Sequence, residues 1–262
     1  MRPKLMGVVN VTPDSFSDGG LYLDPETAIQ HGEELARAGA EILDVGGEST
    51  RPGAEEVPLE EELRRVEPVV AGLAGGAAAI SIDTSKAAVA AAALDAGAEI
   101  VNDVTALRGD PEMAALCADR GATVVLMHMA GSPRTMQANP VYEDVVADVK
   151  AFLAVRVETA LAAGVGEERI WLDPGIGFGK TAEHNLELLR RLSELSELGR
   201  PLVIGTSRKS FIGKVDGSDA NARLGGTIAS SVLAAAEGAA VLRVHDVAEV
   251  GQAMAVAAAI LG

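Results

Sequence analysis

The chain has 262 residues, 48% of them hydrophobic, and its formal net charge at pH 7 is −16. A chain of this length can bury a large core as one domain. The charge argues against nucleic-acid binding, which depends on Lys and Arg neutralising phosphates, but a local cluster of cations can still hold a small anionic ligand. No apolar run approaches the roughly 20 residues of a membrane span. Residues 1–10 lack the features of a secretion signal, so a cytoplasmic location is expected.

Eight short runs rich in Val, Ile and Leu recur along the chain without clean polar alternation, as is typical of parallel strands buried on both faces. They lie at residues 5–10, 41–46, 78–83, 99–104, 123–128, 169–174, 201–207 and 240–246. Helix-like segments separate them. This alternation predicts a (β/α)8 TIM barrel, formed by residues 1–262 as a single domain. A doubly wound open sheet is the structural alternative.

Each predicted strand ends in polar side chains. They are Asn10, Asp44, Asp83, Asn102 with Asp103, His128, Asp173, Ser207 to Ser210, and Arg243 with His245. In a barrel, the active site lies at the carboxyl ends of the strands. One aspartate alone, such as Asp83, is equally well explained as a helix N-cap. Eight polar strand ends together predict a ring of donors and acceptors around one pocket.

The segment DPGIGFGKT (173–181) resembles a phosphate-binding loop but does not match one. Pro174 stands where the P-loop pattern requires its first glycine, and the spacing of the later glycines does not fit a dinucleotide fingerprint. What remains is a Gly-rich loop whose backbone can approach a flat ligand closely. Lys180, at its end, is expected to be exposed at a helix start, and Lys86 is interpreted as a solvated surface charge.

A metal site built from protein ligands alone is disfavoured. The chain has four histidines, and His31 and His184 fall in helical segments. No His-X-His pair follows the first strand, where metallohydrolases with a barrel fold carry one. His128 is interpreted as a satisfied polar group beneath the rim.

The acidic and amide side chains suit a nitrogen heterocycle. Asp83, Asn102 and Asp173 match a ligand with adjacent amino, ring N–H and carbonyl groups, because a carboxylate accepts two N–H bonds side by side and an amide both donates and accepts. Lys209 is able to donate to the carbonyl. Arg243 either stacks on the ring or pairs structurally with Asp246.

At these residues the sequence resembles the dihydropteroate synthases of the folate pathway, in the pterin-binding family. The segments that carry the resemblance span nearly the whole chain in order. They are GVVNVTPDSFSDGG (7–20), DVGGESTRPGA (44–54), SIDTSK (81–86), VNDVTAL (101–107), MHMAGSPRTMQ (127–137), DPGIGFGKT (173–181), GTSRKSFIG (205–213) and RVHDV (243–247).

The resemblance implies a (β/α)8 transferase that condenses p-aminobenzoate with 6-hydroxymethyl-7,8-dihydropterin diphosphate to 7,8-dihydropteroate and pyrophosphate. We expect a dissociative substitution at carbon, because diphosphate is a good leaving group once neutralised. Sulfonamides compete for the p-aminobenzoate end in this family, and its members are commonly homodimers. The alternatives are a pterin-binding methyltransferase domain and an inactive paralogue. The NVTPDSFSDGG and STRPGA loops argue against the methyltransferase.

The resemblance also implies a site with three parts. The pterin set is Asp83, Asn102, Met127, Asp173, Lys209 and Arg243. The diphosphate set is Asn10, Thr50, Arg51, Arg243 and His245, with Mg2+ held through Asn10. The p-aminobenzoate set is Phe16, Arg51, Pro52, Phe178 and Ser210. Catalysis is expected to depend on Arg51, Asp83, Asp173, Lys209, Arg243 and His245.

Three of the four phenylalanines, Phe16, Phe178 and Phe211, fall in segments predicted to be rim loops. A large apolar ring in a polar loop suits a cover that excludes water from a reactive cation. The segment NVTPDSFSDGG is therefore predicted to be a lid over the amine substrate.

Overall fold

The computed structural model describes residues 2–12, 24–50, 53–131, 135–137 and 140–261. Eight parallel strands occur in these ranges, one in each predicted run. They are β1 (Lys4–Asn10), β2 (Ile42–Gly46), β3 (Ala79–Asp83), β4 (Ile100–Asp103), β5 (Thr123–Met127), β6 (Ile170–Asp173), β7 (Val203–Ile204) and β8 (Val241–Val244). The predicted βα alternation is confirmed.

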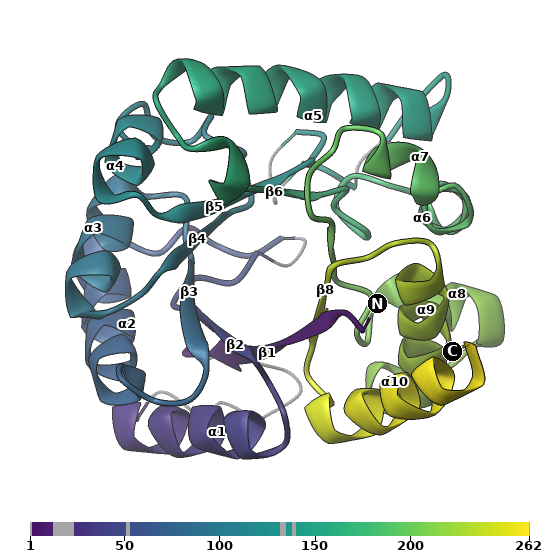
Figure 1. The fold of residues 1–262 in the computed structure, drawn as a ribbon, viewed down its shortest axis with the longest axis horizontal. Helices are drawn as coiled ribbons and strands as arrows, with labels where there is room; N and C mark the ends of the chain where they lie inside the picture. Colours follow the sequence, from purple (N-terminus) through teal and green to yellow (C-terminus); the bar gives the residue numbers. More distant parts are fainter. Residues whose placement is uncertain (1, 13–23, 51–52, 132–134, 138–139, 262) are drawn as a thin grey trace.

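The strands form one sheet that closes into a barrel (Figure 1). Their order is β6-β5-β4-β3-β2-β1-β8-β7, and all pairs are parallel. A single parallel bridge between Leu172 and Leu202, with a 2.9 Å bond from the Leu172 N–H to the Pro201 carbonyl, joins β6 to the segment before β7. This bridge closes the sheet, so the fold is the predicted barrel and not the doubly wound open sheet.

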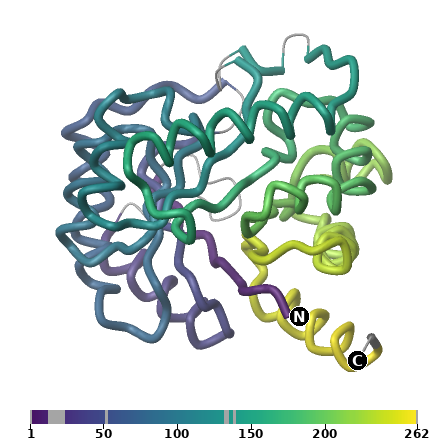
Figure 2. Tube along the Cα trace, turned by 45° about the horizontal axis from the view of Figure 1, so that its top comes forward, coloured from purple at the N-terminus to yellow at the C-terminus, as the bar shows by residue number. Residues whose placement is uncertain are grey.

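Helices surround the strands on the outside (Figure 1). They are α1 (Pro25–Arg37), α2 (Leu59–Leu73), α3 (Ala87–Ala96), α4 (Met113–Arg120), α5 (Val145–Ala162), α6 (Ala182–Arg190), α7 (Ser193–Ser196), α8 (Ser210–Asp216), α9 (Leu224–Ala236) and α10 (Val247–Leu261), with 3-10 turns η1 (Glu167–Arg169) and η2 (Ala220–Ala222). The last helix, α10, lies beside β1 (Figure 2). Across the ranges described, no helix combines the length and apolar character needed to cross a membrane.

Two apolar layers make up the core. The larger layer fills the space between the outer faces of the strands and the helices. A separate cluster inside the barrel contains Met6, Ile42, Ile100, Val125, Val203 and Val241. Successive side chains of a strand point to opposite faces, so the residue two positions beyond each of these again points inward. The apolar cluster is therefore the floor on which the next inward layer rests.

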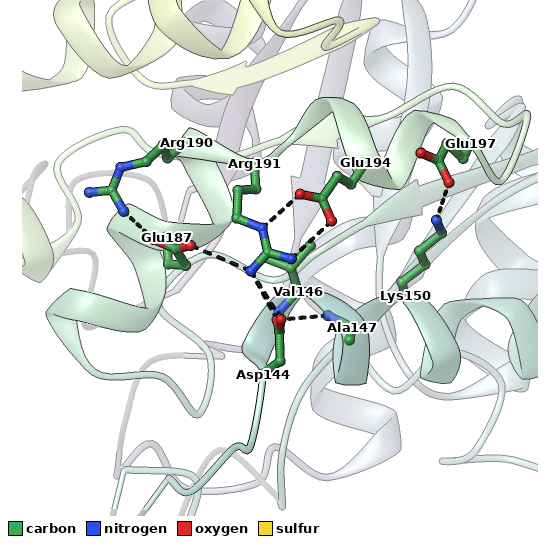
Figure 3. Close-up of polar contacts among 9 residues, drawn as sticks. All are labelled: Asp144, Val146, Ala147, Lys150, Glu187, Arg190, Arg191, Glu194 and Glu197. Carbon is green, nitrogen blue, oxygen red and sulfur yellow. Dashed lines mark hydrogen bonds and ion pairs between the residues drawn. The ribbon is translucent and has the colours of Figure 1, made fainter.

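Outside the barrel, ion pairs of Arg191 link the start of α5 to the segment of α6 and α7 (Figure 3). Arg191 Nη1 lies 3.1 Å from Asp144 Oδ2, and Nε lies 2.7 Å from Glu194 Oε1. Asp144 also caps α5 by accepting the N–H groups of Val146 and Ala147. These groups are partly exposed, so the helix cap and the packing beneath contribute more to stability than the ion pairs.

Candidate functional site

The polar strand ends form the second inward layer of the barrel. The inward positions two residues beyond the apolar floor are occupied by Asp44, Ser81, Asn102, Met127, Asp173 and Arg243. On β3, Asp83 occupies the next inward position, two residues beyond Ser81. Asp44, Asn102 and Asp173 are at most 6% exposed. The alternation of the strands thus gathers side chains from six strands over one floor.

Arg243 is the centre of this layer. Its Nε donates to Asp44 Oδ2 at 2.6 Å, and its Nη2 donates to Asp83 Oδ2 at 2.9 Å. Asn102 Nδ2 donates to the same Asp44 oxygen at 3.1 Å. Burial raises the pKa of Asp83; Arg243 opposes that rise and the charge of Asp44 reinforces it. One guanidinium is therefore shared by two carboxylates that are both buried.

Asp83 does not cap the helix that follows it. The first N–H of α3, on Ala87, donates instead to Asp110 Oδ2 at 2.9 Å. The capping interpretation of Asp83 is wrong, which leaves its carboxylate to Arg243 and the cavity. Arg243 likewise does not pair with Asp246, because Asp246 binds Arg208 Nε at 3.0 Å and Nη2 at 2.5 Å.

Asp173 anchors the Gly-rich loop. Its Oδ1 accepts the N–H of Gly175 at 2.6 Å. Gly175 has φ +68°, and a Cβ at this position would lie 1.9 Å from the His128 carbonyl oxygen, so only glycine fits. Burial raises the pKa of Asp173, while Lys209 and the Gly175 N–H act to lower it.

Lys209 faces the loop from the opposite side. Its Nζ donates to the Ile176 carbonyl and lies 4.9 Å from the centroid of the Phe178 ring. Burial lowers the pKa of the Lys209 amine to about 8; Asp173 acts to raise this value and Arg243 to lower it further. The amine is therefore a donor whose charge changes near neutral pH.

A cavity of about 490 Å³ opens above this layer at the carboxyl ends of the strands. Eight of the sequence-predicted residues line it: Asn10, Thr50, Asp83, Phe178, Lys209, Ser210, Arg243 and His245. Asn102, Met127 and Asp173 are buried beside it, and Met127 packs in a cluster with Met136 and Phe178, which themselves line the cavity. Phe16, Arg51 and Pro52, and with Phe16 the predicted lid, lie outside the described residues.

His245 is positioned by the β7 end of the barrel. Its Nδ1 lies 3.0 Å from Ser207 Oγ, and its backbone N–H donates to the same oxygen at 3.2 Å. Ser207 is buried, and it holds His245 through one contact to the ring and one to the backbone. The imidazole is thereby held at the rim on the same side of the cavity as Arg243.

Sequence reasoning missed the burial of three charged groups. Lys180 is 3% exposed instead of lying at the surface. Lys86 is half-buried and bonds Glu62 and Glu48 rather than water. Asp44 was recognised as a strand end but not as a site residue. A signal for Asp44 was present, because a carboxylate in an inward position of a buried strand requires a cationic partner.

Phe211 was also misplaced. It lies in α8 and is 5% exposed within the outer core, so it is a packing residue and not part of a rim loop. Phe178 does lie in a loop and lines the cavity. His128 behaves as expected, since its Nδ1 bonds Lys180 at 2.9 Å beneath the rim.

The described ranges contain no group of three or more His, Cys, Asp or Glu able to hold a metal ion. Mg2+ commonly keeps several waters and binds one or two side chains together with phosphate oxygens of a substrate. The half-buried Asn10 offers an amide oxygen at the cavity wall. The amide oxygen of Asn10 would therefore suit a Mg2+ ion whose other ligands are waters and phosphate oxygens of a substrate.

Known proteins share both the sequence and the fold. A family model described as "Pterin binding enzyme" matches residues 6–245. The dihydropteroate synthase of Neisseria meningitidis serogroup C is 51% identical over 259 residues, which cover 97% of this chain and 91% of that protein. The Escherichia coli K12 dihydropteroate synthase is 47% identical, with coverages of 99% and 92%.

Solved structures agree. The Yersinia pestis dihydropteroate synthase, solved as a sulfonamide drug complex, superposes with a TM-score of 0.96 at 46% identity, covering 99% of this chain and 94% of that one. The Xanthomonas albilineans enzyme in complex with 7,8-dihydropteroate has a TM-score of 0.89 at 46% identity, with coverages of 100% and 94%. With its acidic, amide and cationic side chains gathered at one end of a parallel barrel, the chain belongs to the pterin-binding enzymes and, among them, to the dihydropteroate synthases.

Proposed function

We propose that the cavity condenses p-aminobenzoate with 6-hydroxymethyl-7,8-dihydropterin diphosphate, giving 7,8-dihydropteroate and pyrophosphate. The observation that carries the proposal is the convergence of Asp83, Asn102 and Asp173 beside Lys209 above the apolar floor of the barrel. Two carboxylates, an amide and an amine match the donor and acceptor edge of a pterin. A pterin-binding methyltransferase is disfavoured, because the relatives above are named dihydropteroate synthases and align over nearly the whole chain.

The pterin end of the site is the deepest. Its N–H groups would bond Asp83 and Asp173, and Lys209 would donate to its carbonyl or a ring nitrogen. To accept the pterin, Asp83 has to exchange its bond from Arg243 Nη2 for bonds from the ligand, while Arg243 Nε stays on Asp44. The freed part of the guanidinium is then able to cover the face of the ring.

The reaction breaks one bond and forms one. The C–O bond between the exocyclic methylene and the diphosphate breaks, and its electron pair leaves on pyrophosphate. The amine nitrogen of p-aminobenzoate then bonds the methylene carbon and releases a proton. Arg243 and His245 would stabilise the charge that develops on the leaving group, and Arg51 is proposed to join them. The carboxylates of Asp83 and Asp173 would stabilise the cationic pterin.

Mg2+ is proposed as the metal of the diphosphate end, with Asn10 as its protein ligand and Thr50 on the adjacent wall. Bound there, the ion would supply neutralisation of the diphosphate charge. Asn10 is the last residue of β1 and lies four residues beyond Met6 of the apolar floor, so the strand alternation turns its side chain inward.

The p-aminobenzoate end is proposed to lie nearer the rim. Phe178 and Ser210 line the cavity there, and Phe16, Arg51 and Pro52 are proposed to complete it. Placing the amine above the pterin lets it reach the methylene carbon as the diphosphate departs. Sulfonamides would compete for this position.

One assay tests the function. Pyrophosphate release should depend on both p-aminobenzoate and the pterin diphosphate, and 7,8-dihydropteroate should form in equal amount. Tight pterin binding without pyrophosphate release would identify an inactive paralogue. Pyrophosphate release that does not depend on p-aminobenzoate would instead indicate a hydrolase.

The quaternary state is proposed to be a homodimer. Apolar side chains on α9 and α10 remain exposed in the isolated chain, among them Leu233 at 63%, Val256 at 55% and Ile260 at 76%. Burying such a face is favourable. Light scattering should give twice the chain mass of 26.8 kDa, and Leu233→Glu should halve it. A monomer at micromolar concentration would refute this proposal.

A further inference from the structure

The carbonyl groups of the Gly-rich loop are held by side chains at every position from Gly175 to Gly179. Lys180 Nζ donates to Gly175 O at 3.0 Å and to Phe178 O at 2.9 Å. The Ile176 carbonyl accepts from Lys209, the Gly177 carbonyl from Gln137, and the Gly179 carbonyl from Tyr142. A short loop without strand or helix partners is thereby fixed by donors from four side chains.

Lys180 is the only one of these donors, among the described residues, that holds two of the carbonyls. Its ammonium carries three hydrogens, and it has three close acceptors: the two loop carbonyls and His128 Nδ1 at 2.9 Å. The side chain is 3% exposed and does not line the cavity. It therefore acts on the protein beneath the site and does not touch a substrate.

The electrostatics of the pair agree with this geometry. Burial lowers the pKa of the His128 imidazole to about 3, and Lys180 and Arg108 lower it as well. His128 is thus neutral, and its Nδ1 is able to accept from Lys180. Burial likewise lowers the pKa of Lys180 to about 7. The charge of Asp173 acts to raise this pKa, and the charge of Lys209 acts to lower it. The three acceptors offset the cost of burying this amine.

What Lys180 positions is Phe178. Its bond to the Phe178 carbonyl fixes the backbone of that residue from below, while Lys209 lies over the ring from the cavity side. The carbonyls of the two preceding residues, Ile176 and Gly177, accept from Lys209 and Gln137. Without Lys180, the Phe178 backbone loses its side-chain donor, and the ring is free to turn away from the cavity.

We propose that Lys180 is a positioning residue for the amine substrate, which it serves by holding Phe178 in place at the wall of the cavity. The inference rests on the proposed function, in which Phe178 borders p-aminobenzoate. In this proposal Lys180 acts through Phe178. It does not act on the pterin, which is proposed to bind Asp83, Asn102 and Lys209. Lys180, at the end of the loop, and Lys209, which faces the loop from the start of α8, therefore serve different substrates.

The test is a double-mutant cycle with Lys180→Met and Phe178→Ala. Each single change should raise the KM for p-aminobenzoate about tenfold, while the KM for the pterin diphosphate and kcat at saturating amine change less than about threefold. Because Lys180 acts through Phe178, adding Lys180→Met to Phe178→Ala should raise the KM by less than about twofold more. Lys150→Met, which removes a surface ion pair with Glu197, is the matched control and should behave as the unaltered protein.

Several results would overturn the proposal. If the KM of the double variant rises by the product of the two single effects, Lys180 acts independently of Phe178. Unchanged KM with a lower melting temperature would show a purely structural lysine. Lys180→Gln, which keeps amide donors, is taken through the same cycle where the methionine variant does not fold. Failure of the proposed function itself would look different, since the unaltered protein would then release no pyrophosphate.

Discussion

Arg243 Nε donates to Asp44 Oδ2 at 2.6 Å, and the Asp44 side chain is completely buried. The same oxygen accepts from Asn102 at 3.1 Å. Asp44 thus fixes one edge of the guanidinium and leaves the other edge for Asp83 or for a ligand. In the proposed exchange of Asp83 for the pterin, this bond to Asp44 would keep Arg243 in the site.

Asp44→Asn should disturb that arrangement while keeping the shape of the side chain. Removing one partner of a buried charged pair commonly costs a few kcal/mol, so kcat/KM for the pterin diphosphate should fall by at least about tenfold. The decrease is measured by pyrophosphate release, with the melting temperature followed in parallel. Asp95→Asn, which alters an exposed pair with Arg120, should leave the kinetics unchanged. Normal kcat/KM in Asp44→Asn would remove this residue from the site.

The pH dependence should report Lys209. Its pKa is about 8, lowered chiefly by burial, so the free protein loses the ammonium as pH rises through this value. We expect kcat/KM for the pterin diphosphate to decrease above about pH 8, because the charged donor is the form that binds. For folding the sign is opposite. The unfolded chain binds more protons than the native one between about pH 8 and the ordinary lysine pKa of about 10.4, so this group adds stability as pH rises through that window.

Lys209→Met is the control for this assignment. The alkaline limb should disappear from the pH profile, and kcat/KM should be low and flat across pH 7 to 9. A limb that persists in the variant would have to arise from another group, such as Asp83, whose pKa burial raises to about 8, and the assignment of the limb to Lys209 would be refuted.

Much of the fold was readable from the sequence because the pattern is local. Each strand is a short apolar run, and on several of them the last inward residue is polar, as at Asp83 and Asp173, although Met127 takes that place on β5. The count of eight and the order along the chain then predict a barrel. Even the shortest strand, Val203–Ile204, falls within the expected run, although only one bridge at Leu172 closes the sheet beside it.

The charged contacts were not readable, because they join residues far apart in the chain. The partner of Arg243 could equally have been Asp246, three residues away, but the inward direction of β8 places the guanidinium against Asp44, 199 residues earlier. The helix start at Lys180 suggested exposure, yet the Gly-rich loop folds its carbonyls over the amine. Such three-dimensional pairings have no sequence spacing to reveal them.

Metal removal should test the diphosphate end. Chelation is expected to abolish turnover, and added Mg2+ should restore it. Because Asn10 is proposed as the protein ligand, Asn10→Ala should raise the Mg2+ concentration for half-maximal activity by roughly tenfold and leave the KM for p-aminobenzoate unchanged. Full activity in the presence of chelator would contradict the proposed role of the metal.

Phe16→Ala tests the predicted lid. If the ring covers the amine substrate, the variant should weaken the use of p-aminobenzoate more than the binding of the pterin diphosphate. The comparison needs the KM for the amine and a direct titration of the pterin ligand. The opposite ranking would place Phe16 away from the amine end of the cavity.

Lys86 should stabilise the segment that leads to Thr50. Its amine lies 2.5 Å from Glu62 Oε2 and also bonds Glu48, a residue of the cavity wall. Glu62 has a side chain that is 1% exposed, and it also accepts from Thr84 at 2.7 Å. Lys86→Met leaves that buried carboxylate without its cation, so the free energy of unfolding should fall by about 3 kcal/mol.

The double variant Lys86→Met with Glu62→Gln separates the ion pair from simple packing. Glutamine still accepts from Thr84 but carries no charge, so the double variant should recover a large part of the lost free energy. Urea unfolding with linear extrapolation measures both variants. Equal losses would mean that the methionine disturbs packing and that the charge of Glu62 is already offset by other groups. Recovery of the free energy of unfolding in the double variant would instead establish that Lys86 is needed to balance the buried charge of Glu62.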